Sequence, residues 1–64
     1  PNPASDVLYI TPGTDLHIYD AMGNMVFSAL TGGSFVDISM LASGIYFVQL
    51  QNSAEQRTEK LIIQ

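Results

Sequence analysis

The 64-residue chain contains no cysteine and no tryptophan, and His17 is its single histidine. Without cysteine it can form neither a disulfide nor a thiolate metal site, and one histidine alone does not make a zinc site. The missing cysteine leaves the redox compartment open. A domain this short lies near the lower size limit for independent folding, where such covalent or metal links are common. We therefore expect its stability to come from a dense apolar core, which a hydrophobic content of 47% allows.

Positive charge is scarce as well. Two cations stand against six acidic residues, for a net charge of −4, and both cations, Arg57 and Lys60, fall in the last eight residues beside Glu55 and Glu59. A chain without a basic patch is a poor match for nucleic acid or an anionic membrane surface. No apolar run approaches the ~18 residues of a membrane span, so we expect no membrane insertion.

The chain begins with Pro1-Asn2-Pro3 and has no initiator methionine. Two prolines around one residue favour an extended lead-in that is poor in hydrogen bonds. We expect residues 1–4 to be a linker junction and residues 1–64 to form one domain cut from a longer polypeptide. Any targeting peptide would then lie upstream.

Turn-forming residues recur at short intervals, and segments of strand length fill the gaps. The longest gaps are too short for a stable helix, and none shows a helical period. The spacing predicts six strands, at about residues 6–10, 16–19, 25–29, 35–38, 44–51 and 57–64. Short strands at this spacing indicate an all-β fold, a small antiparallel β-sandwich.

The segment that follows Gly44 is the most strand-prone of the chain. Ile45, Tyr46, Phe47 and Val48 are all β-branched or aromatic. Four apolar residues in a row predict a strand in the middle of a sheet, covered on both faces. Gly44 marks a sharp turn or a close approach of the backbone to another segment.

Strand alternation places Leu16 and Ile18 on one face of their strand and His17 and Tyr19 on the other. Asp20 then follows, at a position where its carboxylate can accept hydrogen bonds from the amides of the next loop. Gly23 fits a left-handed position that closes that loop. We interpret Asp20 and Gly23 as structural turn residues, with a metal ligand as the alternative for Asp20.

The residue types needed for catalysis are present but carry no local signature. His17 with Ser39 or Ser43 and an aspartate supplies the types of a hydrolytic triad, without the motif of a nucleophile. The glycine pair Gly32-Gly33 lacks the lysine and the helix of a phosphate-binding loop. We therefore expect no catalytic site and no cofactor.

The sequence offers two candidate binding functions. Asp15, Asp20 and Asp37 are candidates to meet at one end of a sandwich, but the calcium-loop spacing of alternating acidic residues is absent, so we expect no metal site. The three tyrosines, Tyr9, Tyr19 and Tyr46, are candidates for an aromatic sugar platform, although cross-strand packing explains them as well. An accessory carbohydrate-binding or adhesion module of a secreted enzyme is accordingly the alternative function.

Four elements, in order and spacing, resemble the C-terminal sorting domain of type IX (Por) secretion cargo, type A. The opening Pro1-Asn2-Pro3 is followed by an apolar strand, and a strand with an Asp-and-Gly turn occupies residues 16–23. Asp37-Ile38-Ser39 leads into Leu41-Ala42-Ser43-Gly44-Ile45-Tyr46-Phe47, and residues 59–63 form a lysine-plus-apolar ending. The likeness spans essentially the whole chain.

The resemblance implies an immunoglobulin-like antiparallel β-sandwich of six to seven strands that acts as a non-catalytic secretion signal. It further implies that the cargo, N-terminal to the domain in the same polypeptide, reaches the periplasm through a signal peptide. An outer-membrane translocon then recognises the folded domain and moves the cargo to the cell surface or the medium. A surface sortase related to cysteine proteases would remove the domain and join the cargo to lipopolysaccharide.

By resemblance, the residues to weigh for translocon recognition are Gly44, Lys60, Leu61, Ile62, Ile63 and Gln64. The apolar end of the chain is suited to pair with a receptor's sheet edge, with Lys60 setting the register or meeting an acidic partner. Lys60 is equally suited to be a solvated guard against unwanted edge pairing. For Gly44 a turn requirement is the favoured interpretation, in which case its replacement disturbs sorting by unfolding the domain. Self-association through an uncovered strand edge is a further expectation.

Overall fold

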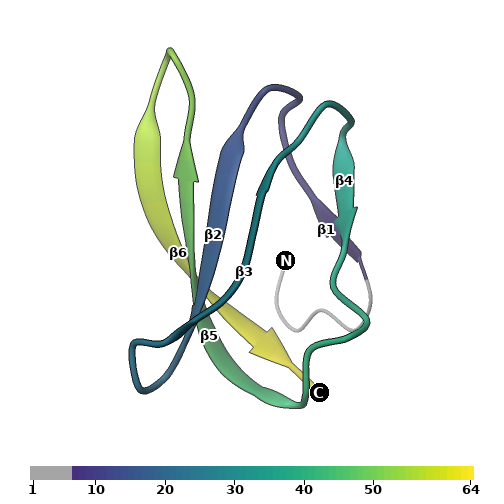
Figure 1. Cartoon of the computed structure of the whole chain (residues 1–64), viewed down its shortest axis with the longest axis vertical. Coiled ribbons are helices and arrows are strands. Elements are labelled where there is room, and N and C mark those ends of the chain that lie inside the picture. The colour runs from purple at the N-terminus through teal and green to yellow at the C-terminus, as the bar shows by residue number, and fades with distance from the viewer. Residues whose placement is uncertain (1–6) are drawn as a thin grey trace.

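The structure, a computed structural model, describes residues 7–64. These residues form six strands and no helix (Figure 1). The strands are β1 (Val7–Tyr9), β2 (Asp15–Asp20), β3 (Met25–Leu30), β4 (Phe35–Asp37), β5 (Gly44–Gln51) and β6 (Gln56–Ile63). All six predicted strands are present, with ends that differ by a residue or two. The predicted linker at residues 1–4, and Asp6 at the start of the first predicted strand, lie outside the described residues.

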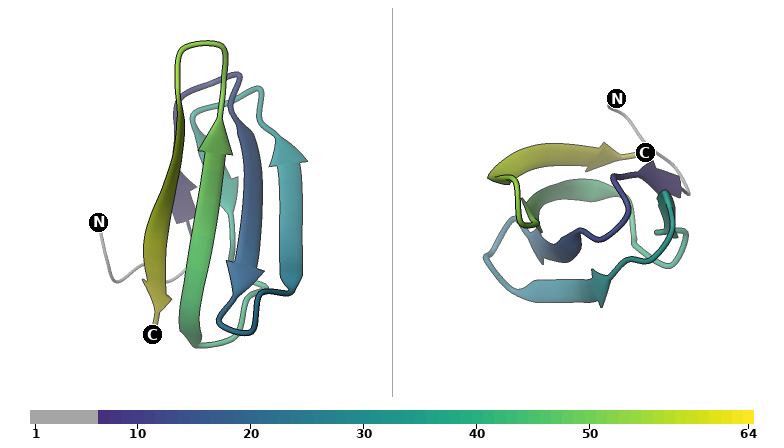
Figure 2. Two further views of the ribbon diagram at one scale, coloured as in Figure 1. Left: turned by 90° about the vertical axis from the view of Figure 1, so that its left-hand side faces the viewer. Right: turned by 90° about the horizontal axis from the view of Figure 1, so that it is seen from above.

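The strands form two antiparallel sheets. One has four strands in the order β3-β2-β5-β6, and the other pairs β1 with β4. Seen from above, the larger sheet curves around the interior and the β1–β4 pair closes the remaining side (Figure 2). The prediction of an all-β antiparallel sandwich is therefore confirmed. No helix in this part of the chain is long or apolar enough to cross a membrane.

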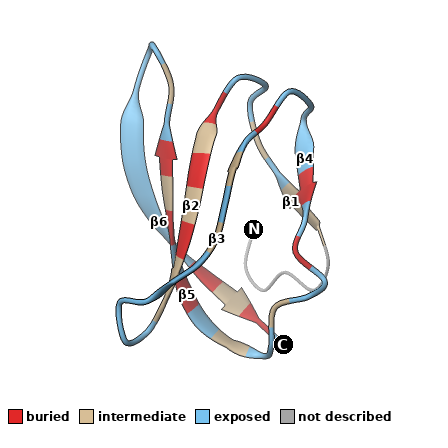
Figure 3. Cartoon of the chain, in the orientation of Figure 1, coloured by how far each residue is buried: buried red, intermediate tan, exposed pale blue. Residues whose placement is uncertain are grey.

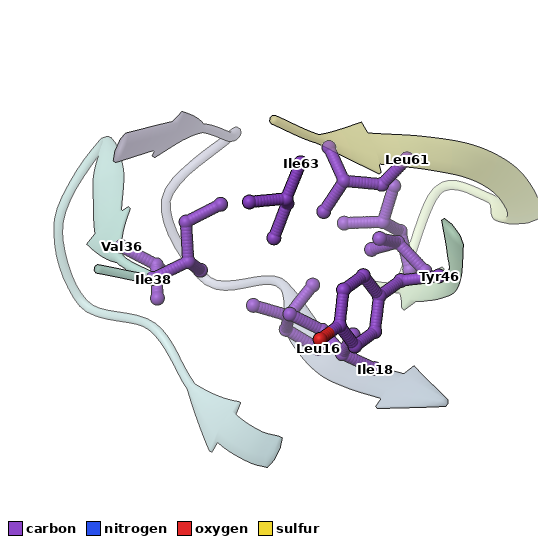
Figure 4. Close-up of a cluster of buried hydrophobic side chains, with 9 residues drawn as sticks. Leu16, Ile18, Val36, Ile38, Tyr46, Leu61 and Ile63 are labelled. Atoms are coloured by element: carbon purple, nitrogen blue, oxygen red, sulfur yellow. The ribbon is translucent and has the colours of Figure 1, made fainter. Parts of the chain in front are cut away.

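The core lies between the two sheets and follows strand alternation. In β2, Leu16 and Ile18 point inward and are fully buried. They are joined by every second residue of β5, by the end of β6 and by β4 with its following residue, as Figure 4 shows. The buried set is Leu16, Ile18, Val36, Ile38, Tyr46, Val48, Leu50, Leu61 and Ile63. This single apolar interior provides the burial that a chain without cross-links needs.

β5 is the central strand of the core, paired with β2 on one side and β6 on the other. That part of the prediction was right. The predicted coverage of both faces was wrong, because no described strand packs on the outer face: Ile45 is 45% exposed and Phe47 41% exposed. Figure 3 shows the resulting alternation of buried and exposed residues along the strand. Of the four apolar residues 45–48, Tyr46 and Val48 are therefore buried in the core, whereas Ile45 and Phe47 lie on the exposed face.

A tight turn connects β4 to β5. The Leu41 amide donates to the carbonyl of Ile38 at 3.0 Å, and Leu41 is partly buried against the core. The hydroxyl of Tyr46 then reaches back from β5 and donates to the carbonyl of Ala42 at 2.7 Å. This hydrogen bond ties the turn to the strand that follows it, because a buried hydroxyl needs a partner.

Replacing Tyr46 with phenylalanine is expected to remove this hydrogen bond and leave the Ala42 carbonyl without its donor. The cost is about 1 kcal/mol of unfolding free energy, which lowers Tm by roughly 4–8 °C in a domain of this size. Thermal unfolding followed by circular dichroism measures it. Tyr9→Phe is the matched control, since Tyr9 is 76% exposed. Equal melting of the two variants would contradict the assigned role of the hydroxyl.

Candidate functional site

The segment Lys60–Gln64, predicted to carry the signal, is built into the larger sheet. Leu61 and Ile63 point into the core, where they are 3% and 4% exposed, opposite Tyr46 and Gly44 of β5 (Figure 4). Lys60 and Ile62 alternate with them and therefore lie on the outer face. Gln64 follows the end of β6 and is exposed. Only some of the predicted site residues thus present a side chain to a partner.

On the outer face, Ile62 lies opposite Ile45, and Lys60 lies opposite Phe47. Phe47 in turn lies opposite Tyr19 of β2, which is paired with Met25 of β3. Five neighbouring side chains thus form an apolar area across all four strands, which we name the outer apolar patch: Tyr19, Met25, Ile45, Phe47 and Ile62. Met25, Ile45 and Phe47 are exposed, and Tyr19 and Ile62 are half-buried. An exposed cluster of this kind is typical of a protein-binding surface.

Beyond the patch the outer face is mainly polar, with Leu30 and Val26 of the edge strand β3 as exposed apolar exceptions. The next row across the sheet runs from Ser28 through His17 and Gln49 to Thr58. His17 lies between Asp15 and Met25, with Nε2 at 3.2 Å from the Asp15 carboxylate and Nδ1 at 3.4 Å from the Met25 sulfur. The outer face is therefore divided into a polar half and an apolar half. The apolar half is the one that holds the end of β6.

The outer apolar patch was not predicted from the sequence, because Ile45 and Phe47 were expected to be buried in a strand covered on both faces. A signal for the open face was present in the same strand. Gln49 and Gln51 continue the alternation of Ile45 and Phe47, and glutamine side chains favour solvent. The pairing of Phe47 with Tyr19 depends on strand order, which no local pattern gives.

Gly44 begins β5 with φ of +156°. A β-carbon added there would lie 3.9 Å from the Cε1 of Tyr46, an ordinary contact, so space does not require glycine. The backbone does, because L-residues rarely adopt this φ. Gly44 thus provides the backbone conformation with which β5 begins.

Asp20 and Gly23 shape the β2–β3 hairpin. The Oδ1 of Asp20 accepts hydrogen bonds from the amides of Met22 and Asn24, both at 2.9 Å. The Gly23 amide donates to the Asp20 carbonyl at 3.0 Å, and Gly23 has φ of +89°. The amide of Asn24 first, and then that of Met22, lower the pKa of Asp20 because they favour the charged carboxylate, and they outweigh the opposing effect of desolvation.

Asp37 acts in the same way before the β4–β5 turn. Its Oδ1 accepts a hydrogen bond from the Ser39 amide at 2.9 Å. This bond, with a further one from the Ser39 side chain, lowers the pKa of Asp37. The carboxylates at both positions thus bond to their own loops.

A small hollow borders the core. It has a volume of about 130 Å³ and lies between β1 and the β5–β6 hairpin, lined in part by Leu8, Ile10, Val48, Leu50, Arg57 and Glu59. Pockets for small organic ligands are larger, at about 300–1,000 Å³. At its rim the Arg57 Nε lies 3.2 Å from the Glu59 carboxylate. The hollow is a gap in the cover of the core rather than a ligand site.

Other ligand chemistry finds little support. Within residues 7–64, no group of three or more acidic, histidine or cysteine side chains is arranged to hold a metal ion. Tyr46 is buried in the core, Tyr19 lies on the outer face of the larger sheet, and Tyr9 belongs to the smaller sheet. The three tyrosines therefore share no platform for a sugar.

The chain matches the family described as secretion system C-terminal sorting domain over residues 1–64. It belongs to that family. Comparison with curated proteins and with solved structures gave no match. The family is that of type IX secretion sorting signals, so the domain belongs to a cargo handled by that system and exported across the outer membrane to the surface or the medium. Domains of this family are in general non-catalytic.

Replacing Gly44 with alanine in this sorting domain is expected to cost roughly 1–3 kcal/mol, the usual range for an unfavourable backbone conformation. Gly33→Ala is the control, because an added β-carbon at Gly33 meets nothing within 4 Å and no left-handed φ is involved. Urea denaturation of both variants gives the comparison. A Gly44→Ala domain as stable as the Gly33→Ala domain would show that the backbone does not require glycine there.

The lowered pKa of Asp20 makes the β2–β3 hairpin sensitive to acid. Because the folded-state pKa lies below the unfolded-state value, the carboxylate stabilises the domain above about pH 4, and this contribution is lost as the pH falls through the folded-state pKa. In Asp20→Asn the drop in Tm from pH 7 to pH 3 is expected to be smaller than in the unmodified chain. Glu55→Gln, which alters an exposed carboxylate 3.9 Å from Arg57, serves as the control. An unchanged drop in Asp20→Asn would refute the role of the charge.

Proposed function

We propose that the folded domain is the address that a type IX outer-membrane translocon reads once the cargo has reached the periplasm through a signal peptide. The cargo lies N-terminal to the domain in the same polypeptide. A surface sortase then removes the domain and joins the cargo to lipopolysaccharide. The family gives the sorting role, and the particular steps and the surface that is read belong to the proposal.

The outer apolar patch supports the larger sheet's outer face as the surface that the translocon recognises. A signal read as a folded surface needs shape and exposed apolar area rather than a reactive group, and binding energy concentrates on aromatic and large apolar side chains. The patch provides Phe47 and Tyr19 at its centre. It joins them to Ile62, which comes from the terminal segment that the family resemblance singles out.

The terminal segment contributes to this surface through alternate residues. Leu61 and Ile63 are buried, so their share in recognition is to hold β6 in the sheet. Ile62 provides apolar contact, and the exposed Lys60 provides a positive charge beside Phe47. A receptor surface that is apolar at its centre and acidic at its edge has the matching chemistry.

This division also affects how the signal should be tested. Removing Lys60–Gln64 takes two core residues with it, so a truncated domain loses delivery whether or not the translocon contacts the segment. Single substitutions on the outer face separate recognition from folding. Threonine is a suitable replacement, since it is polar, β-branched and favourable in strands.

Ile62→Thr and Phe47→Thr are expected to reduce delivery of a reporter to the cell surface or medium at least tenfold, the equivalent of about 1.4 kcal/mol of lost binding. The reporter carries a signal peptide, the native upstream linker and residues 1–64 in a type IX-competent host. Lys60→Gln is expected to reduce delivery less, by removing charge alone. Immunoblots of surface, medium and periplasmic fractions measure the distribution.

Gln49→Thr is the matched control, because Gln49 lies on the same face of β5 one row from Phe47. It should be delivered like the unmodified domain, and circular dichroism of each purified domain should show a folded sandwich. Normal delivery of folded Ile62→Thr and Phe47→Thr would reject the patch as the recognised surface. Failure of the unmodified domain to deliver the reporter would instead reject the proposed function of this chain.

A further inference from the structure

The two edges of the larger sheet differ in chemistry. The edge strand β6 carries Arg57, Glu59 and Lys60 and is preceded by Glu55, whereas residues 21–36, which include the edge strand β3, contain no charged residue. Arg57 and Glu59 also lie at inward positions, opposite Leu50 and Val48. Charges placed on an edge, and inward charges above all, prevent a strand from pairing with another chain. Only β6 has this protection.

The unpaired side of β3 exposes main-chain groups. In an antiparallel pair, residues alternate between bonding to the neighbouring strand and pointing away from it. The Thr31 amide donates to the Thr14 carbonyl at 3.0 Å, and the register pairs Ala29 with Leu16 two residues earlier. The main-chain groups of Ala29 and Thr31 therefore face β2. Ser28 and Leu30 accordingly direct their main-chain groups to the open side. No other described strand pairs with β3 there.

The side chains along this edge are apolar and exposed. Leu30 is 77% exposed, and Met25 and Val26 are exposed as well. Met22 before the strand and Phe35 after it extend the apolar border, at 86% and 60% exposed. β3 has six uncharged residues, contains no glycine or proline and lies at an edge of the sheet. Such a segment is prone to pair with an identical one.

We propose that β3 is a self-association edge, which pairs antiparallel with β3 of a second copy about a two-fold axis. Pairing through the outward main-chain groups places Ser28 opposite Ser28 and Phe27 opposite Ala29, and it brings Leu30 beside Val26, the residue at the register shift between β2 and β3. Each pair is uncharged, and the larger side chain of each unequal pair meets a smaller or flexible one. Inward residues then face inward residues, so two four-stranded sheets continue into one.

The second copy fits this edge because the pairing is isologous: the same patch serves both partners and the contact closes after two copies. The interface is a single six-residue strand with its flanking side chains, which is smaller than the interfaces of stable dimers. We therefore expect a weak dimer, with Kd between about 10 μM and 1 mM. This inference is independent of the sorting role.

Sedimentation equilibrium of residues 1–64 over a range of concentrations from about 10 μM to 1 mM tests the proposal. The weight-average mass of the unmodified chain should rise from the monomer value toward twice that value. Ser28→Lys places like charges opposite each other at the axis and should raise Kd at least tenfold. Thr58→Lys is the matched control, because Thr58 lies in the same row of the outer face at the β6 edge, and its Kd should change less than twofold.

A chain that stays monomeric over the whole range would overturn the proposal. Equal weakening by Ser28→Lys and Thr58→Lys would also overturn it, because general charge repulsion would then explain the loss. Species larger than a dimer would exclude the closed two-fold contact. A heteronuclear NMR titration adds a direct readout: amide shifts on dilution should concentrate at residues 25–31 and leave residues 56–59 unchanged.

Discussion

The structure depends on one constraint: the apolar interior between the two sheets must hold the fold without a disulfide, because the chain has no cysteine. Leu16 and Ile18 from β2, alternate residues of β5 and the end of β6 supply it. Each of these strands can give only every second side chain to the interior. The residues between them are then left on the outer face, whatever their polarity. Folding and the surface available for recognition are therefore set by the same alternation.

That coupling explains how the end of the chain can be both structural and exposed. Leu61 and Ile63 are core residues, while Lys60 and Ile62 belong to the outer face. A receptor that contacts the outer apolar patch therefore contacts a surface that exists only when β6 is in the sheet. Such a signal reports that the domain is folded. This agrees with the proposal that the sorting domain is recognised as a folded surface.

The sequence predicted the elements better than their surroundings. Turn residues and β-branched runs located all six strands, because these preferences act within a few residues. The hydrogen bonds of Asp20 could also be expected from the sequence, because they reach only to the nearby amides of Met22 and Asn24. Coverage of the outer face was misjudged because it depends on what packs above the sheet. The run from Ile45 to Val48 looks the same in a sheet with one covered face or two.

The candidate site was harder to predict than the fold for a related reason. Phe47 joins Tyr19 and Lys60 only through the strand order β2-β5-β6, and this order brings together residues about 28 and 13 positions apart in the chain. The resemblance drew attention to Lys60–Gln64 as one segment, although alternation divides it between the interior and the surface.

The same reasoning distinguishes the two edges of the sheet. β6 borders the hollow beside β1. Its residues Arg57 and Glu59 occupy inward positions there, opposite Leu50 and Val48. Charged side chains at such positions disfavour pairing of an edge strand with another chain. β3 gives Phe27 and Ala29 to its inward face and no charge to its edge. Both cations of the chain lie in β6, so charge protects that edge alone, although both edge strands contribute an outer-face residue, Met25 from β3 and Ile62 from β6, to the proposed recognition surface.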